Sequence, residues 1–370
     1  MSSRRIAALA FAVTCVFPAA VLHAQGLPTA APESVGMSAE RLKNIAGAFQ
    51  KEIDKGNMPG VVVMVARKGR LVYSDTIGFQ NKVTGKPMPK DAIFRIYSMT
   101  KPLVSVAAMM LVEDGKLELT DPVSKFLPAM KNMQVSVAKV DAEFARTTYT
   151  LVPADREITV QDLLRHTAGL AYANLTLNKA VIDAYVKGGI DADFRNLTPD
   201  EEVERVSKAP LIHQPGTVWE YSIAVDVLGR VIEAVSGKRL ADFLDERLLK
   251  PLGMKDTGFF VAAEKMDRLA EALPVDASSG QPNKLYDVSS VPNNDSGGGG
   301  GVSTAADYLR FAQMMANGGQ LDGKRYLSRT TVELMTSDHL GSRIQAQSPM
   351  TKAPAGSRGG ATISRETVAR

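Results

Sequence analysis

In residues 94–115, FRIYSMTKPLVSVAAMMLVEDG, a polar quartet leads directly into an apolar segment. Ser98 and Lys101 stand three residues apart, and this spacing has two interpretations. One is an ordinary helix start, because serine is common at helix N-termini and lysine is a good helix former. The other is a nucleophilic serine with its activating base, the S-x-x-K motif. The same spacing recurs at Ser136 and Lys139, so the motif alone leaves both interpretations open.

The residues after Lys101 favour a helix that is buried on nearly all sides. Apolar residues occupy almost every face between Leu103 and Leu111, and such a helix belongs in a protein core. Pro102 fits only in the first turn, where a backbone N–H is not needed. The helix is therefore predicted to begin near Ser98, with Lys101 one turn later on the same side.

The composition is that of a globular protein. The 370 residues are 45% hydrophobic and 23% charged, and the net charge is +4. The sequence contains no basic stripe, RNA-binding signature or metal-type Cys/His cluster, so we expect no nucleic-acid partner.

The first 24 residues have the pattern of a secretory signal peptide. Two arginines precede an apolar core from Ile6 to Ala20, and small residues end at Ala24. The core is short for a transmembrane span, so no stable membrane anchor is expected. The only cysteine, Cys15, lies in this segment, which leaves the mature chain without disulfides or a cysteine nucleophile. We expect a periplasmic or secreted protein.

The sequence predicts helices and strands in its first 100 residues and mainly helices after them. A helix is predicted from Ser38 towards Gly56, followed by a β-hairpin that turns at Lys68-Gly69. Residues from about 100 to 280 are predicted to be mainly helical. Capping residues indicate later helix starts at Thr159, Thr198 and Thr304, and two more helices are predicted after Ser222, separated near Gly237.

A serine nucleophile needs partners that accept and return its proton. Lysine can do this only where burial or a neighbouring positive charge favours its neutral form. A tyrosine held near the lysine could carry the proton to the leaving group, and Tyr221 in QPGTVWEYSIAVDVLG is a candidate. Taken alone, Tyr221 is better interpreted as a core aromatic with a hydrogen-bonded hydroxyl.

Other hydrolase patterns are missing or weak. The sequence contains neither G-x-S-x-G nor H-E-x-x-H. His166 could serve a Ser-His-Asp triad, but a structural position is favoured because no serine is singled out for it. The glycine run NNDSGGGGG, residues 293–301, fits either a linker or a loop that brings backbone close to a ligand.

Together with their order, five motifs resemble the serine β-lactamase-like superfamily, in particular its class C β-lactamase and family VIII carboxylesterase branch, over roughly residues 35–340. The motifs are YSMTK (97–101), LLRHTAGL (163–170), PGTVWEYS (215–222), KPLGMKDTGF (250–259) and GGGGGVSTAADYLRF (297–311). The resemblance implies that Ser98 is the acylated nucleophile, Lys101 its activator and Tyr221 the general acid/base. It implies no metal and no organic cofactor. It places His166 in a structural loop and makes the Ser136/Lys139 pair a chance match.

The same resemblance implies an α+β fold of the β-lactamase/transpeptidase type, with an antiparallel sheet flanked by helices and a mainly helical domain. The expected division is a signal peptide at 1–24, a discontinuous α/β domain at 25–100 and 290–340, a helical domain at 101–289, and an atypical, disordered tail at 341–370.

One motif separates the two branches. Class C β-lactamases usually have Y-A-N where this chain has Tyr221-Ser222-Ile223, and the Y-S-x form resembles the esterases. Ser222 is accordingly a candidate substrate-binding residue. The expected function is hydrolysis of short-chain esters, with a β-lactamase or a D-alanyl peptidase as alternatives. The expected partner is a small ester or β-lactam.

The C-terminus departs from the pattern. The superfamily places K-T-G, H-x-G or W-x-G on a late strand that supplies one oxyanion donor, and residues after Gly341 contain no such motif in a strand-like setting. Lys352 does not fit this motif, because a proline two residues later interrupts a strand. Gly359-Gly360 resembles it only weakly. The change predicts a truncated or frame-shifted C-terminus, and a non-catalytic acyl- or penicillin-binding remnant is a further alternative.

Overall fold

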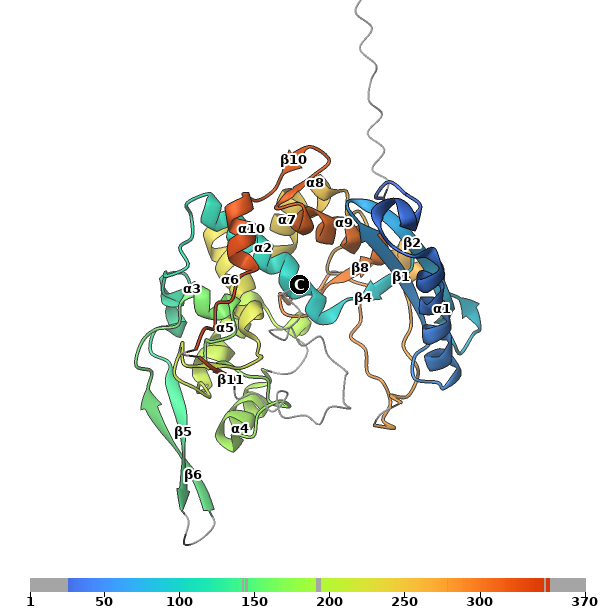
Figure 1. The fold of residues 1–370 in the computed structure, drawn as a ribbon. Helices are drawn as coiled ribbons and strands as arrows, with labels where there is room; N and C mark the ends of the chain where they lie inside the picture. Colours follow the sequence, from blue (N-terminus) through green and yellow to red (C-terminus); the bar gives the residue numbers. More distant parts are fainter. Residues whose placement is uncertain are drawn as a thin grey trace, which may run out of the picture.

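The computed structural model describes residues 26–346 apart from 142, 144, 145, 191–193, 278 and 343. A sheet with α1 lies on one side of the molecule and a group of helices on the other (Figure 1). The strands are β1 (Gly60–Arg67), β2 (Arg70–Asn81), β3 (Lys86–Pro87), β4 (Ile93–Arg95), β5 (Gln134–Asp141), β6 (Arg146–Pro153), β7 (Val218–Trp219), β8 (Val302–Thr304), β9 (Gln320–Leu321), β10 (Lys324–Arg325) and β11 (Gln345–Ala346). The helices are α1 (Ala39–Asp54), α2 (Thr100–Glu113), α3 (Val160–Leu164), α4 (Lys179–Gly188), α5 (Pro199–Lys208), α6 (Ala224–Ser236), α7 (Leu240–Leu244), α8 (Lys250–Leu252), α9 (Ala305–Ala316) and α10 (Arg329–Met335).

β1 and β2 form the antiparallel hairpin that the sequence predicts. Lys68 and Gly69 have φ values of 52° and 72°, and two successive left-handed residues are the requirement of a two-residue type I′ turn. The predicted helix before the hairpin is also confirmed: the Ser38 side chain caps α1 by accepting from the Arg41 N–H. Both α1 and α9 pack on β1.

β4 and β8 join the two ends of the chain. Ile93 pairs with Thr304 and Arg95 with Val302, and the Ile96 N–H continues the contact by donating to the Gly301 carbonyl at 2.9 Å. This pairing brings the start of α2 against the glycine run. The pairing connects the two segments, 25–100 and 290–340, that are predicted to form the discontinuous α/β domain. The division into domains itself stays a prediction.

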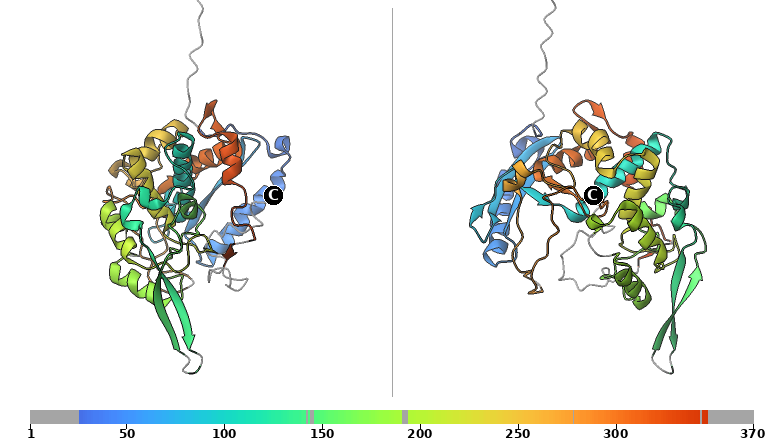
Figure 2. Two further views of the ribbon diagram at one scale, coloured as in Figure 1. Left: turned by 90° about the vertical axis from the view of Figure 1, so that its left-hand side faces the viewer. Right: turned by 180° about the vertical axis from the view of Figure 1, so that it is seen from behind.

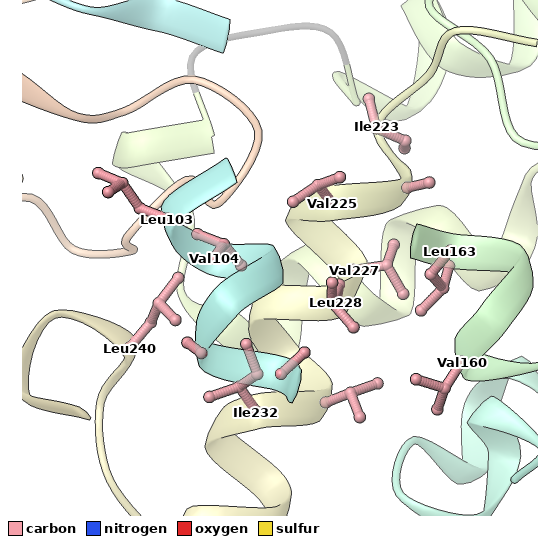
Figure 3. Close-up of a cluster of buried hydrophobic side chains, with 14 of the residues drawn as sticks. Leu103, Val104, Val160, Leu163, Ile223, Val225, Val227, Leu228, Ile232 and Leu240 are labelled. Carbon is pink, nitrogen blue, oxygen red and sulfur yellow. The ribbon is translucent and has the colours of Figure 1, made fainter. Parts of the chain in front are cut away.

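α2 is the centre of the helical side, as its apolar sequence predicts. Val104 lies on the side of α2 nearer α6, where Leu228 lies between α2 and α3, whereas Leu103 points away from α6 (Figure 3). These side chains are almost fully buried, and each contributes about 1.5–3 kcal/mol of transfer free energy. Because α2 is enclosed, the backbone that enters it at Ser98 is held in place.

The hairpin β5–β6 is not among the elements that the sequence predicts, although it lies in the region expected to be mainly helical. It projects from the body of the molecule in both views of Figure 2. The second S-x-x-K pair lies on β5, where Ser136 is buried and Lys139 exposed. Residues three apart on a strand point to opposite faces, so this pair cannot act together.

The prediction of mainly helical structure up to about residue 280 is wrong beyond α8. The chain from Gly253 to Gly301 is irregular over its described residues, apart from a 3₁₀ turn at Ala263–Arg268 and short bridges. Pro274, Pro282 and Pro292 lack the N–H that a helix interior requires. This irregular chain carries the glycine run to α2 and α6.

The predicted signal peptide, Cys15 and most of the predicted tail lie outside the described residues, so they stay predictions. The described end of the tail, Gln345–Ala346, pairs in parallel with Val218–Trp219. Over residues 26–346, with the gaps given above, the structure contains no helix both long and apolar enough to cross a bilayer.

A buried carboxyl group links α5 to α6. Glu202 is 1% exposed, and its Oε2 accepts from Asn294 Nδ2 at 2.5 Å. Arg230 lies 3.6 Å from the same oxygen, but its terminal nitrogens contact Glu233 and the Asp295 carbonyl, each at 2.7 Å. Because burial outweighs the Arg230 charge, the pKa of Glu202 is raised to about 7.

We expect Glu202 to make the protein less stable as pH rises. Its carboxyl group binds a proton in the folded state up to about pH 7 but ionises near pH 4.5 when unfolded, so stability present below pH 4.5 is lost as pH rises through 7. Glu202→Gln should remove this loss, so that between pH 5 and 8 the melting temperature of the wild type falls relative to the variant by about 2 °C or more. Glu204→Gln, exposed on the same helix, is the control. Parallel melting curves for wild type and Glu202→Gln would contradict the assignment.

Candidate active site

Ser98 lies in a 3₁₀ turn, Tyr97–Met99, that leads directly into α2. The α-helix itself begins at Thr100, two residues later than the sequence predicts. Tyr97 has a φ of 42°, a left-handed conformation that is strained for a tyrosine, and Thr100 Oγ1 donates to its carbonyl at 2.6 Å. This turn presents Ser98 at the surface, where its side chain is exposed.

Lys101 extends from the first turn of α2 towards three acceptors. Its Nζ lies 3.3 Å from Ser98 Oγ, 3.2 Å from the Tyr172 hydroxyl and 2.7 Å from the Gly298 carbonyl oxygen. An ammonium group has three hydrogens, so this geometry can satisfy each of them. The residue as a whole is 8% exposed.

Tyr221 completes the group from the segment between β7 and α6. Its hydroxyl lies 2.5 Å from Ser98 Oγ, and Lys101 Nζ lies 4.6 Å from the centre of its ring. A cation over an aromatic face is attracted by it. The structure thus brings together Ser98, Lys101 and Tyr221, the three residues that the sequence predicts as catalytic.

His166 lies behind Tyr221 and supports it. The two ring centres are 5.0 Å apart, and the His166 carbonyl accepts from the Glu220 N–H at 2.9 Å. Its Nδ1 contacts Ser222 Oγ at 3.3 Å, not Ser98. Burial and the Lys101 charge lower the pKa of His166 to about 3, so the ring is neutral at pH 7. His166 therefore lies where a structural residue is expected, and it does not contact Ser98 as a triad histidine would.

Ser222 and Ile223 point into the protein. Ser222 is 1% exposed, and its hydroxyl contacts His166 and accepts from the Ala224 N–H at the start of α6. Ile223 is fully buried. The geometry therefore gives Ser222 a structural role at the start of α6, while its substrate role stays a prediction.

The glycine run is a closely packed loop and not a linker. A Cβ at Gly297 would lie 2.5 Å from the Val225 carbonyl oxygen, one at Gly298 would lie 2.1 Å from Asp226 Oδ2, and one at Gly301 would lie 2.6 Å from Thr100 Oγ1. At Gly299 the nearest atom is 3.9 Å away. Glycine is needed here for close approach to α2 and α6, whereas the approach of this backbone to a ligand stays a prediction.

A pocket of about 230 Å³ opens beside Ser98 and is bounded by Gly298, Gly299 and Gly300. The rest of its lining combines aromatic with polar side chains: Tyr97, Tyr172, Phe194 and Tyr286, and Arg195, Asp226 and Ser296. The Tyr286 hydroxyl donates to the Gly299 carbonyl at 2.8 Å, which ties Tyr286 to the glycine loop. Among the residues that the structure describes, no three His, Cys, Asp or Glu side chains gather as metal ligands would.

Sequence reasoning missed Tyr172, Tyr286 and the Gly298 carbonyl. Tyr172 follows the LLRHTAGL motif by two residues, so its nearness to that motif was a usable signal. A contact made by a backbone carbonyl cannot be predicted from residue type, because every residue has a backbone carbonyl group. The predicted absence of a K-T-G, H-x-G or W-x-G strand stays a prediction, because Lys352 and Gly359-Gly360 lie outside the described residues.

Comparison with known proteins identifies the family. The family model "Beta-lactamase" matches residues 45–358. An uncharacterized protein of Mycobacterium tuberculosis is 38% identical over 302 residues, covering 79% of this chain and 71% of that protein. Esterase EstB of Burkholderia gladioli is 31% identical over 344 residues, covering 87% and 80%.

A solved structure has the same fold. EstCE1, described as a hydrolase with promiscuous acyltransferase activity, aligns with a TM-score of 0.66 and 30% identity over 82% of this chain and 78% of that one. The α+β fold of the β-lactamase/transpeptidase type is therefore confirmed. With more than four fifths of its length matched by the family model, the chain belongs to the beta-lactamase family.

Proposed function

We propose that the protein is a serine carboxylesterase that hydrolyses short-chain esters through an acyl-enzyme on Ser98. One observation carries the proposal: Ser98 Oγ is contacted by both Tyr221, at 2.5 Å, and Lys101, at 3.3 Å. A serine that shares its hydroxyl with two proton-transferring groups is arranged for nucleophilic attack.

In the first half-reaction, Ser98 Oγ bonds to the ester carbonyl carbon while its proton passes to the Tyr221 oxygen, which acts as the general base. Lys101 stabilises the negative charge on that oxygen through its position at the ring face and at Ser98. The bond between carbon and the alkoxy oxygen then breaks, and the alkoxy oxygen takes the proton from Tyr221 and leaves as the alcohol. The N-terminus of α2 favours the negative charge that develops beside Ser98.

In the second half-reaction, water attacks the acyl carbon and gives a proton to Tyr221. The bond to Ser98 Oγ breaks, Oγ recovers that proton, and the carboxylic acid leaves. Tyr221 thus acts as base and acid in turn, which one residue can do when it contacts the nucleophile directly.

The surroundings of Ser98 favour esters over β-lactams. Tyr97 and Met99, on either side of it, are 42% and 46% exposed and offer apolar surface to an acyl or alcohol group. The position at which class C β-lactamases usually have asparagine is the buried Ile223, so no amide is available there to orient a lactam. Esterase EstB provides a named relative with ester activity.

Acyl transfer to an alcohol is a second candidate. Ser98 is exposed, so an alcohol could replace water in the second half-reaction without a change in the first. EstCE1, which has the same fold, is described as combining hydrolase and acyltransferase activity. Product analysis with p-nitrophenyl butyrate and butanol distinguishes the two activities: hydrolysis gives butyric acid, and acyl transfer gives butyl butyrate.

The proposal is tested by comparing p-nitrophenyl butyrate, nitrocefin and a D-Ala-D-Ala peptide as substrates of the same preparation. We expect turnover of the ester to exceed that of the other two. Nitrocefin turnover far above ester turnover would favour a β-lactamase instead. A stable mass adduct with a fluorophosphonate, but no turnover of any substrate, would identify a binding protein.

Tyr221→Phe is expected to lower kcat for p-nitrophenyl butyrate by about 10²–10⁴-fold, since it removes the general acid/base. KM should change little, because the ring and its contact with His166 remain. Steady-state kinetics with Tyr149→Phe, a tyrosine on the projecting hairpin, as control would check this. A fall in kcat of less than tenfold would exclude the assigned role.

A further inference from the structure

Asp226 is a buried carboxylate that the mechanism above does not use. It lies in the first turn of α6, five residues after Tyr221, and is 2% exposed. Its Oδ1 accepts from the Gly298 N–H at 2.9 Å and from Ser296 Oγ at 2.6 Å. Ser222, and not Asp226, accepts from the Ala224 N–H that begins α6, so the Asp226 carboxylate is directed at the glycine loop.

The residue that Asp226 holds is the one that binds Lys101. Gly298 donates its N–H to Asp226 and accepts from Lys101 Nζ through its carbonyl, at 2.7 Å. The contact is close enough that a Cβ on Gly298 would lie 2.1 Å from Asp226 Oδ2. The Asp226 carboxylate therefore determines where the Gly298 backbone lies, and with it the position of the carbonyl.

The Gly298 carbonyl is the fixed partner of Lys101. It makes the shortest of the three Lys101 contacts, and the other two, to Ser98 Oγ and the Tyr172 hydroxyl, are at 3.3 and 3.2 Å. A hydroxyl group can rotate, and Ser98 becomes acylated during the reaction, whereas a packed backbone carbonyl stays in place. Throughout the proposed reaction, then, Lys101 is held by Gly298.

We propose that Asp226 is a positioning residue that orients Lys101 towards Ser98 by fixing the Gly298 backbone. The proposal rests on the proposed function, in which Lys101 assists acylation of Ser98. A misplacement of about 1 Å at a reacting group can lower a rate about 10²-fold, so loss of the Asp226 contact should be visible in the acylation step.

The chain contains a matched control in Asp307. It occupies the same position in α9, the third residue, and is also buried. Its Oδ2 accepts from the Asp256 N–H at 2.7 Å and from Thr257 Oγ1 at 3.0 Å. Asp307 therefore fixes a loop by the same chemistry, but none of the three Lys101 contacts described above is to that loop.

The experiment compares Asp226→Ala, Asp226→Asn and Asp307→Ala in the full chain, with a fluorophosphonate as the probe of Ser98 and intact mass as the readout. For Asp226→Ala we expect the maximal rate constant of labelling to fall about 10²-fold, with a displaced pH–rate profile and little change in the probe concentration at half-maximal rate. Asp226→Asn keeps an acceptor oxygen and should recover most of the rate. Asp307→Ala should lower the melting temperature but leave the labelling rate near that of the wild type.

Equal losses of rate in Asp226→Ala and Asp307→Ala, at equal folded fraction, would overturn the proposal, as would a wild-type rate in Asp226→Ala. If the wild type is not labelled at all, the proposed function fails, and ¹³C-lysine NMR decides the positioning role without activity. The Lys101 Cε resonance, assigned with Lys101→Arg, should then move in Asp226→Ala and not in Asp307→Ala. An unmoved resonance in Asp226→Ala would refute the role.

Discussion

Ser98→Ala is expected to abolish hydrolysis of p-nitrophenyl butyrate, with kcat falling by roughly 10⁴–10⁶-fold. The substitution removes the oxygen that both Tyr221 and Lys101 contact. It should not unfold the protein, because the Ser98 side chain is exposed. Initial rates at saturating ester, together with a melting curve, measure the two effects separately.

The second S-x-x-K pair provides the control. Ser136→Ala and Lys139→Ala change the same residue types at the same spacing, but on β5, where the two side chains point to opposite faces. We expect kcat to stay within about threefold of the wild type when corrected for folded protein. Ester turnover that survives in Ser98→Ala would overturn the assignment of the nucleophile.

Gly298→Ala is expected to have the largest effect of any single added methyl group at the site. Its Cβ would lie 2.1 Å from Asp226 Oδ2, so either the loop or α6 must move. Overpacking of this kind costs about 1–3 kcal/mol, and the Gly298 carbonyl would move away from Lys101. We expect a lower melting temperature and a fall in kcat of about 10²-fold or more.

Gly299→Ala is the control that distinguishes the close contact with Asp226 from a general effect of alanine in the glycine loop. The nearest atom to its Cβ would be 3.9 Å away, an ordinary van der Waals distance, so the melting temperature should stay close to that of the wild type. Equal melting temperatures for Gly298→Ala and Gly299→Ala would contradict the close packing of Gly298 against Asp226.

The residues of the site could be predicted where their spacing in the sequence reflects one local element. Ser98 and Lys101 lie one turn apart, and Pro102 fixes where that turn can begin. Tyr221 could be found because it stands in a motif whose order along the chain is informative. The hairpin at Lys68-Gly69 and the capped helices follow from local chemistry in the same way.

Contacts that depend on the tertiary structure could not be predicted. The Gly298 carbonyl and Tyr286 reach the site only through the irregular chain between α8 and β8, where proline and polar turn residues carry no periodic pattern. The hairpin β5–β6 was not predicted because its strands lie between helical segments and pair mainly with each other. Ser222 shows the reverse case: the motif suggested a substrate contact, but its hydroxyl accepts from the backbone at the start of α6.

The contact between Lys101 and Gly298 spans 197 positions of the chain. During synthesis, therefore, α2 leaves the ribosome long before the carbonyl that holds its lysine. Contacts between residues so distant in sequence form late in folding, so we expect Ser98, the proposed nucleophile, to become fully reactive only when the last parts of the domain have docked. On this expectation, labelling of Ser98 by a fluorophosphonate measures the completion of folding, because partly folded chains contain Ser98 before Lys101 is held by the Gly298 carbonyl.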